Sequence, residues 1–196
     1  MKIALSLISL TALVAVAAAD PNLALGKPVV DSSGYYNSGS EVFPAQTITD
    51  GRYNDTGTGF DWSFWLTPQN SNGYATVDLG ATYSVSSFVL QDTHNRGYFD
   101  RGTNAYTIAL STDGVNFTDV VSDSFSNAEW SGLTLKTNTL GVSSLGRYVR
   151  FTVDTRYGAS AGLNEIEVYG QPVPEPATMA ALGLGAIGLL RRRRKA

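Results

Sequence analysis

Hydrophobic and polar positions alternate along this chain in short segments, which is the pattern of a β-rich protein. Turn-prone clusters separate the segments, for example at 112–114 and 156–162. In the segment 147–155, the alternation places Val149, Phe151 and Val153 on one face, which we expect to be buried. No window of the central region shows sustained helical periodicity. Five stretches rich in β-branched and aromatic residues are predicted strands: 74–80, 83–93, 105–111, 147–155 and 163–170.

These strands predict an all-β fold, a sandwich or a barrel, because they are short and are joined by irregular loops. One long segment, 32–72, departs from the pattern: it is rich in Gly, Ser, Asn, Asp and Tyr and poor in aliphatic runs. A stretch of this length inside a compact domain is usually functional, or is held by something other than the core. A metal ion is therefore a candidate for this segment.

The N-terminal residues 1–19 have the pattern of a secretory signal peptide. Lys2 precedes an apolar run over 3–16, and small residues follow at 17–19, so we expect signal peptidase to cleave after Ala19. A buried N-terminal helix is the alternative, but a core helix would show a broader polar face than the three hydroxyl residues of this run, Ser6, Ser9 and Thr11.

Residues 20–170 have the usual length of one domain. They carry eight Lys and Arg against sixteen Asp and Glu, a formal charge of −8, which repels phosphate backbones and argues against nucleic acid as a partner. The chain has no cysteine and only one histidine, His94. This composition excludes disulfides and Cys-ligated zinc and disfavours a His-rich metal site.

The same composition predicts a protein that is not an enzyme. A thiol nucleophile is absent, a Ser-His-Asp arrangement has only His94 to use, and no serine lies in a Gly-x-Ser-x-Gly motif. Paired carboxylates stay open as an alternative, because sixteen acidic residues allow many pairs.

Seven segments in order resemble the discoidin family, the type C domains of coagulation factors and the family 32 carbohydrate-binding modules. The resemblance covers residues 20–170 and implies a jelly-roll β-sandwich. The matching segments are "NLALGKPV" (22–29), "AQTITDG" (45–51), "FWLT" (64–67), "ATVDLG" (75–80), "FVLQDTHNRGYFDRGTNAYTIALSTDGVNF" (88–117), "RYVRFTV" (147–153) and "LNEIEVYG" (163–170).

The resemblance implies a structural calcium ion, which takes several oxygen ligands. Carried over position by position, the carboxylates would come from Asp50 and Glu165, a hydroxyl and a carbonyl from Ser63, and carbonyls alone from Thr47, Arg52 and Asn164. The alternatives are a turn-capping role for Asp50 before Gly51 and an edge-strand role for Glu165. The loop 52–62 is longer than in compact relatives, so Asn54, Asp55 or Asp61 is a possible replacement for one of these ligands.

The resemblance also implies a glycan site in the loop 92–103, where aromatic rings stack on a sugar and charged groups take its hydroxyls. For Arg101 the sequence favours a simpler role, an ion pair with Asp100 or Asp92. Two further aromatic residues in other loops, Trp130 and Tyr157, are placed to line the same end. The candidate ligand-binding residues are His94, Arg96, Tyr98, Arg101 and Trp62.

These features predict an exported carbohydrate-binding module with extracellular polysaccharide or another glycan as its partner. The alternative is a structural or adhesive matrix protein that has no specific glycan ligand. Binding to a glycan array, lost when loop residues are replaced, would separate the two.

After residue 170 the composition changes to a proline-stiffened linker over 171–176, an apolar segment over 177–190 and a basic end over 191–196. Fourteen apolar residues are short of the ~20 that a helical span needs. A permanent membrane anchor is one interpretation. The segment also resembles the PEP-CTERM sorting signal of Gram-negative bacteria, with Pro174, Glu175 and Pro176 as its tripeptide. That resemblance implies transient insertion in the inner membrane, processing by an exosortase, and a mature form at the cell surface or in the extracellular matrix.

Overall fold

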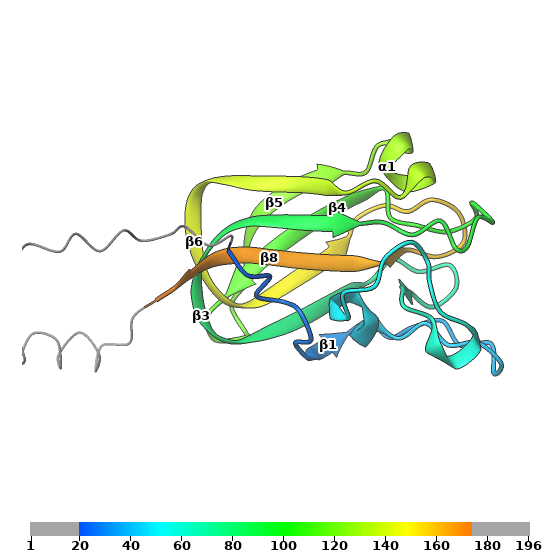
Figure 1. Cartoon of the computed structure of the whole chain (residues 1–196), viewed down its shortest axis with the longest axis horizontal. Coiled ribbons are helices and arrows are strands. Elements are labelled where there is room, and N and C mark those ends of the chain that lie inside the picture. Colours follow the sequence, from blue (N-terminus) through cyan, green and yellow to red (C-terminus); the bar gives the residue numbers. More distant parts are fainter. Residues whose placement is uncertain (1–19, 174–196) are drawn as a thin grey trace, which may run out of the picture.

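The computed structural model describes residues 20–173, which form a β-sandwich. Asp20 and the end of the last strand lie at one end of the sandwich, and the long irregular loops lie at the other (Figure 1). The predicted signal peptide (1–19), the Pro174-Glu175-Pro176 motif and the segments 177–190 and 191–196 fall outside the described residues. Within the described part of the chain, no helix is long and apolar enough to cross a membrane.

Two long strands, β3 (Tyr74–Gln91) and β6 (Lys136–Val153), organise the fold. The first half of β3 pairs with the second half of β6, and with β1 (Val29–Ser32), while β4 (Ala105–Ser111) and β5 (Thr118–Ser124) extend this layer beyond β6. The second half of β3 lies between the first half of β6 and β8 (Glu165–Pro172). The two long strands therefore bend from one layer of the sandwich into the other (Figure 1).

The remaining elements are short and lie mostly at the loop end. A two-residue strand pair joins β2 (Trp65–Leu66) to β7 (Gly162–Leu163). The 3-10 helices η1 (Ala45–Thr49) and η2 (Gly59–Asp61) lie in the segment 32–72. The α-helix α1 (Asn127–Gly132) begins at a capping box in which Ser126 and Glu129 bond each other's backbone N–H.

The all-β prediction is confirmed, but several strand boundaries differ. The predicted strands 74–80 and 83–93 are one strand, β3, interrupted by register shifts, and the predicted 147–155 is only the second half of β6. The elements β1, β5 and the first half of β6 were not predicted, because their sequences are too polar to alternate clearly. The helix α1 was missed as well, although its Ser-x-x-Glu capping box was visible in the sequence.

The hydrophobic core lies between the layers and contains the residues that alternation predicted in β6. Val149 and Phe151 are fully buried and Val153 is 3% exposed. Trp65 is also fully buried, and its indole N–H donates to the Gly34 carbonyl at 3.0 Å. A second, smaller cluster holds the segment 32–72 together; its members are Phe43, Phe64 and Leu66, with Tyr36 and Trp62 packed against them. This segment is thus held in part by its own aromatic packing.

Candidate functional site

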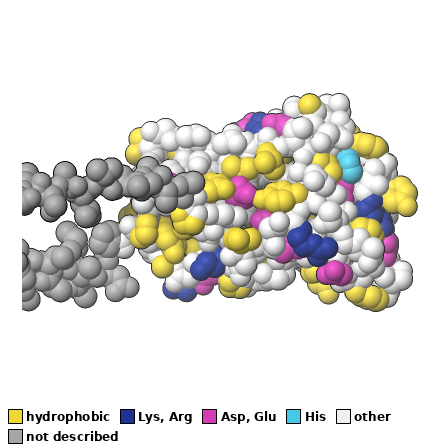
Figure 2. Space-filling model, in the orientation of Figure 1, with side chains coloured by type: hydrophobic (Ala, Val, Ile, Leu, Met, Phe, Trp, Pro, Cys, Tyr) yellow, Lys and Arg dark blue, Asp and Glu magenta, His cyan; other side chains and the backbone are white. Residues whose placement is uncertain are grey.

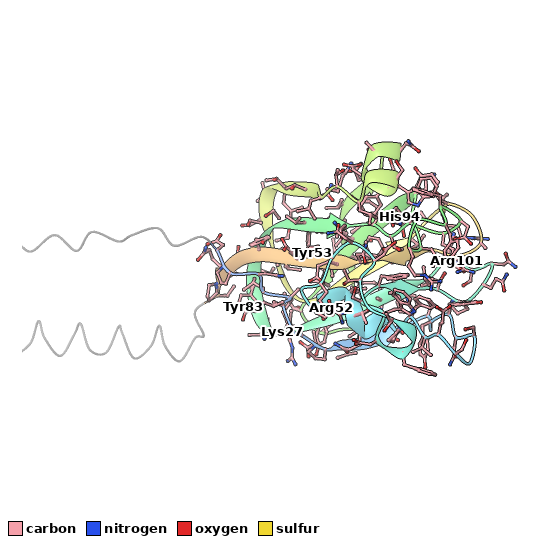
Figure 3. All side chains as sticks on the ribbon, turned by 45° about the vertical axis from the view of Figure 1, so that its right-hand side comes forward. Lys27, Arg52, Tyr53, Tyr83, His94 and Arg101 are labelled. Carbon is pink, nitrogen blue, oxygen red and sulfur yellow. The ribbon has the colours of Figure 1, made fainter. Side chains whose placement is uncertain are left out.

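The loop 92–103 joins β3 to β4 at the loop end of the sandwich, where Figure 3 shows His94 and Arg101. Three of its non-glycine residues, Asn95, Arg96 and Phe99, have backbone φ values of 56°, 62° and 54°, in the left-handed region that is unfavourable for most residues other than glycine. Gly102 has a φ of 144°, and a Cβ there would lie 2.4 Å from the Trp130 indole nitrogen. The loop therefore has a specific conformation that its surroundings must stabilise.

Asp55, 7% exposed, stabilises this conformation from the neighbouring loop 52–62. One carboxylate oxygen, Oδ2, accepts the backbone N–H of Arg96 at 2.6 Å and of His94 at 3.3 Å, and lies 2.7 Å from His94 Nδ1. The other, Oδ1, accepts the Asn164 side-chain N–H at 2.8 Å, and Asn164 in turn accepts the Asp55 backbone N–H. One buried carboxylate thus ties the two loops to the residue that precedes β8.

Arg96 lies among aromatic rings of the cluster that holds the segment 32–72. Its guanidinium carbon is 4.5 Å from the Trp62 ring centroid, 5.3 Å from that of Tyr98 and 5.5 Å from that of Phe43. The guanidinium also forms an ion pair with Glu41. These contacts fix the planar group between rings. Tyr98 remains 68% exposed, so a large part of its ring is open to a ligand.

Arg101 does not form the ion pair that the sequence favoured. Its guanidinium carbon lies 4.7 Å from the Tyr36 ring centroid, and the buried Nε has no hydrogen-bond partner among the described residues. Asp100 instead accepts the Asn95 side chain at 2.7 Å. Asp92 accepts two backbone N–H groups inside the fold, and burial raises its pKa well above the usual range.

His94 belongs to a different aromatic row. Its ring meets Phe99 edge-on at 4.8 Å between centroids, Phe99 meets Trp130 at 5.9 Å, and Trp130 stacks on Tyr157 at 4.3 Å. The Trp130 indole N–H donates to the Arg101 carbonyl at 2.9 Å. The α-helix, the loop 156–162 and the loop 92–103 therefore meet along this row.

The structure thus divides the five candidate ligand residues. Trp62, Arg96 and Tyr98 form one group, which we call the arginine–aromatic cluster, and Arg101 stacks on the ring of Tyr36 at its border. Tyr36 lies 5.9 Å from Phe43 between ring centroids, which connects the two arginines through aromatic contacts. Figure 2 shows the histidine at this end, with hydrophobic and basic side chains beside it.

The sequence did not predict the residues that contact Arg96 from distant parts of the chain. Tyr36, Glu41 and Phe43 lie more than fifty residues before Arg96 in the chain, and nothing in their local pattern indicates the contact. Asp55 was considered only as a metal ligand, whereas its carboxylate is engaged by the loop 92–103.

The candidate calcium site lies where β8 begins, beside η1. Glu165 is fully buried: its Oε2 accepts the Gly51 N–H at 3.1 Å, and its Oε1 has no partner among the described residues. Burial, with Asp50 and Glu167 nearby, raises the pKa of Glu165 to about 9. Burial also raises the pKa of Asp50. An unpaired buried oxygen between carboxylates is a place where a cation would relieve an unfavourable arrangement.

The other predicted metal ligands fit this site to different degrees. Asn164 has both side-chain groups engaged, and the Arg52 side chain pairs with Asp61 at 3.4 Å, so a metal would have to use the backbone carbonyls of these residues. The Thr47 carbonyl accepts the Asp50 N–H at 3.1 Å and keeps a second lone pair. The Ser63 hydroxyl contacts the Thr56 hydroxyl at 2.8 Å and donates to the Thr56 carbonyl at 2.9 Å, so metal binding by this hydroxyl would compete with these hydrogen bonds.

All three replacement ligands have other partners, and Asp61 is paired with Arg52. Asp55 holds the loop 92–103, and the Asn54 side chain accepts from Gln91. Within residues 20–173, no group of three or more His, Cys, Asp or Glu side chains is arranged to hold a metal. A calcium ion here would therefore depend on Asp50, Glu165 and backbone carbonyls.

The described domain is thus a β-sandwich whose aromatic and arginine-bearing loops lie at the end opposite to the end of β8. The chain belongs to the F5/8 type C domain family, the discoidin family: the family model matches residues 29–167. Residues 172–195 match the PEP-CTERM protein-sorting motif. A comparison with curated proteins finds no match.

Solved structures with a similar fold include sugar-binding proteins. A fucolectin from striped bass (Morone saxatilis) serum is 24% identical over 81% of this chain and 52% of its own, with a TM-score of 0.63. The family 32 module of Clostridium perfringens NanJ, in complex with galactose, is 22% identical over 71% of this chain and 90% of its own, with a TM-score of 0.54. Chitosan-binding module 2 from Paenibacillus sp. IK-5, in complex with chitotriose, is 27% identical over 76% of this chain and all of its own, with a TM-score of 0.55.

Proposed function

We propose that this protein is an exported carbohydrate-binding module that acts at the cell surface or in the exopolysaccharide matrix of a Gram-negative bacterium. The observation that carries the proposal is the arginine–aromatic cluster at the loop end of a fold shared with sugar-binding modules. Tyr98 supplies an exposed ring for the apolar face of a pyranose, and the Arg96 guanidinium, held by its ion pair with Glu41, supplies N–H donors in a fixed position beside that ring.

The sorting motif supports the cellular part of this proposal. We propose that the precursor inserts transiently in the inner membrane and that an exosortase processes it near Pro174-Glu175-Pro176. Mass spectrometry of exported protein tests this step: the expected product lacks Leu190 and the terminal arginines, and exported protein that retains them would contradict processing.

Calcium is proposed as a structural cofactor. When bound, the ion supplies positive charge between Asp50 and Glu165, and so connects η1 to the start of β8. Protein groups hold the surrounding residues in place. Gly51 donates its N–H to Glu165, and Asn164 positions Asp55 and hence the ligand loop. Calcium binding would thus be coupled to the geometry of the ligand loop, because Glu165 contacts the ion and the adjacent Asn164 positions Asp55.

Glycan binding is testable on residues 20–173. The core residues lie between Leu23 and Val168, and the Paenibacillus module is covered over its full length, so this domain is a self-contained unit. Arrays and polysaccharide pull-downs should show saturable retention, and Arg96→Ala or Tyr98→Ala should weaken the affinity by about tenfold, the value of one stacked ring.

The outer face of the sandwich offers a matched control. The Arg147 guanidinium carbon lies 5.0 Å from the Tyr148 ring centroid and the guanidinium pairs with Asp78, as that of Arg96 pairs with Glu41, so Arg147→Ala and Tyr148→Ala remove the same two side-chain types outside the ligand loop. These variants should retain glycan binding. If no glycan is retained and the domain instead associates with itself, the structural or adhesive matrix protein becomes the better interpretation.

A further inference from the structure

The two layers of the sandwich leave an open seam on one side. β5 pairs only with β4, so its other edge is unpaired. The first half of β6, residues 136–145, pairs only with β3, because β4 pairs with residues 148–153. Two free strand edges, 118–124 and 136–144, therefore face each other across the seam.

A groove of about 570 Å³ lies along this seam, within the ~300–1,000 Å³ range of ligand pockets. At one end side chains bridge its two edges: Asn138 donates to Asp123 at 2.7 Å, and Lys136 lies 3.0 Å from Asp123 and donates to the Ser124 carbonyl. A second hollow, beside Leu145, shares residues with the groove and extends the seam. The seam is thus closed at one end and open toward the bend of β6.

The accessible lining of the groove is mainly polar, and three partly buried residues form its small apolar floor. Val120, Val121 and Leu140 line it and pack against the main core. A register shift in β5 beside Val121 lets two consecutive valines face inward. The rim consists of hydroxyl and carboxylate side chains, which include Thr118, Asp119, Ser122, Thr137, Thr139 and Ser144.

This chemistry fits an extended peptide better than a sugar. None of the residues that line the groove is aromatic, so the stacking surface that pyranose rings use is missing there. Facing strand edges instead offer rows of backbone N–H and C=O groups, which an added strand can pair. A strand with alternating apolar side chains would cover the floor with one face and leave the other face in solvent.

The charges that line the groove indicate which kind of added strand it would bind. Asp119 and Asp123 both line the groove; Lys136 neutralises Asp123, whereas Asp119 is exposed and makes no ion pair or side-chain hydrogen bond among the described residues. A second copy of the chain is a poor occupant, because antiparallel pairing of two β5 strands about Val121 would place Asp119 opposite Asp123, whose cationic partner Lys136 is already engaged, so Asp119 would gain no positive partner. A basic segment supplies a positive partner for Asp119.

We propose that the seam between β5 and the first half of β6 is a strand-addition site for an extended, basic peptide segment of another protein. This site is separate from the loop end, and it would allow one domain to hold a glycan and a protein partner together. It closes the open side of the sandwich, since one added strand would bridge the two free edges.

The test uses residues 20–173 and a labelled peptide, acetyl-Lys-Val-Thr-Val-Lys-Val-Thr-Val-Lys-amide, at low salt. Fluorescence anisotropy should show saturable binding, and amide hydrogen exchange should slow in 118–124 and 137–144. The same peptide with alternate backbone nitrogens methylated keeps its side chains but loses half of its N–H donors, so it should bind at least about tenfold more weakly.

A charge exchange gives the specific readout. Asp119→Lys should weaken binding of the lysine peptide and favour a peptide with glutamate in place of lysine. Asp31→Lys makes the same charge change on β1, where it also removes an ion pair with Arg150, and should leave both affinities unchanged. The proposal is overturned if the lysine peptide fails to bind at about 1 mM, if the methylated peptide binds equally well, or if chitotriose displaces the peptide and protects the same amides.

Discussion

Replacing Glu165 with glutamine should have different effects on the stability of the metal-free and the calcium-bound protein. The carboxyl is fully buried, one oxygen has no partner among the described residues, and its pKa is raised to about 9, so at pH 7 the metal-free group is mainly protonated. Glutamine has the same shape as a protonated glutamate and no charge. In a chelator, Glu165→Gln should therefore change the free energy of unfolding by less than about 1 kcal/mol.

In calcium, the wild type and the Glu165→Gln variant should differ in stability. An ion that binds only the native state stabilises it by about 2.7 kcal/mol when its concentration is a hundred times the Kd. For a domain of this size, that corresponds to a rise in Tm of about 5–10 °C. Glutamine removes one of the two carboxylates that face the ion, so the variant should lose most of this rise.

Thermal unfolding followed by circular dichroism, at pH 7 in calcium chloride or in chelator, measures both quantities. Glu167→Gln is the matched control: Glu167 lies two residues along the same strand and accepts the hydroxyls of Tyr53 and Tyr169, so its loss should lower the Tm equally with and without calcium. Two results would refute the reasoning: a wild-type protein that does not respond to calcium, or a Glu165→Gln variant that keeps the full response.

Three further substitutions test the loop and the sheet. Asp55→Ala leaves buried N–H donors unpaired and should cost on the order of 2–4 kcal/mol in urea unfolding while weakening glycan binding; unchanged binding would mean that the loop 92–103 does not depend on this carboxylate. Gly102→Ala places a methyl group against Trp130 and should destabilise the domain by roughly 2–4 kcal/mol; a neutral effect would contradict the close packing. The ion pair with Arg147 lowers the pKa of Asp78. The stability that this carboxylate contributes is therefore present above its ordinary pKa and is lost as pH falls through the lowered value. Asp78→Asn should accordingly destabilise the domain at pH 7 and approach the wild type near pH 2; an equal loss at both would remove the ion pair as the cause.

The glycan loop shows how far sequence reasoning reaches within one segment. Both its position between two strands and its residue types were visible in the sequence, and three of the candidate residues, Trp62, Arg96 and Tyr98, do meet. The separation of His94 into another aromatic row was not visible, because it depends on the α-helix that carries Trp130. That helix is only six residues long, too short for a periodic pattern to stand out.

Strand prediction failed for the same physical reason in β5 and the first half of β6. An edge strand that faces solvent needs few apolar side chains, so the segments 118–124 and 136–144 read as polar loops although they are well-paired strands. The seam groove is formed by these two elements, and for this reason no sequence pattern indicated it.

The sequence by itself determined the all-β class, the buried face of β6, the family, the acidic charge and the sorting motif, because each depends on local alternation, composition or a short contiguous motif. Tertiary structure alone decided which ring each guanidinium meets, that Asp55 secures the ligand loop, that Glu165 keeps a buried oxygen unpaired, and that two strand edges face each other across a seam. Such contacts join residues dozens of positions apart, and their existence depends on how the two layers bend and pack rather than on any neighbouring residues in the chain.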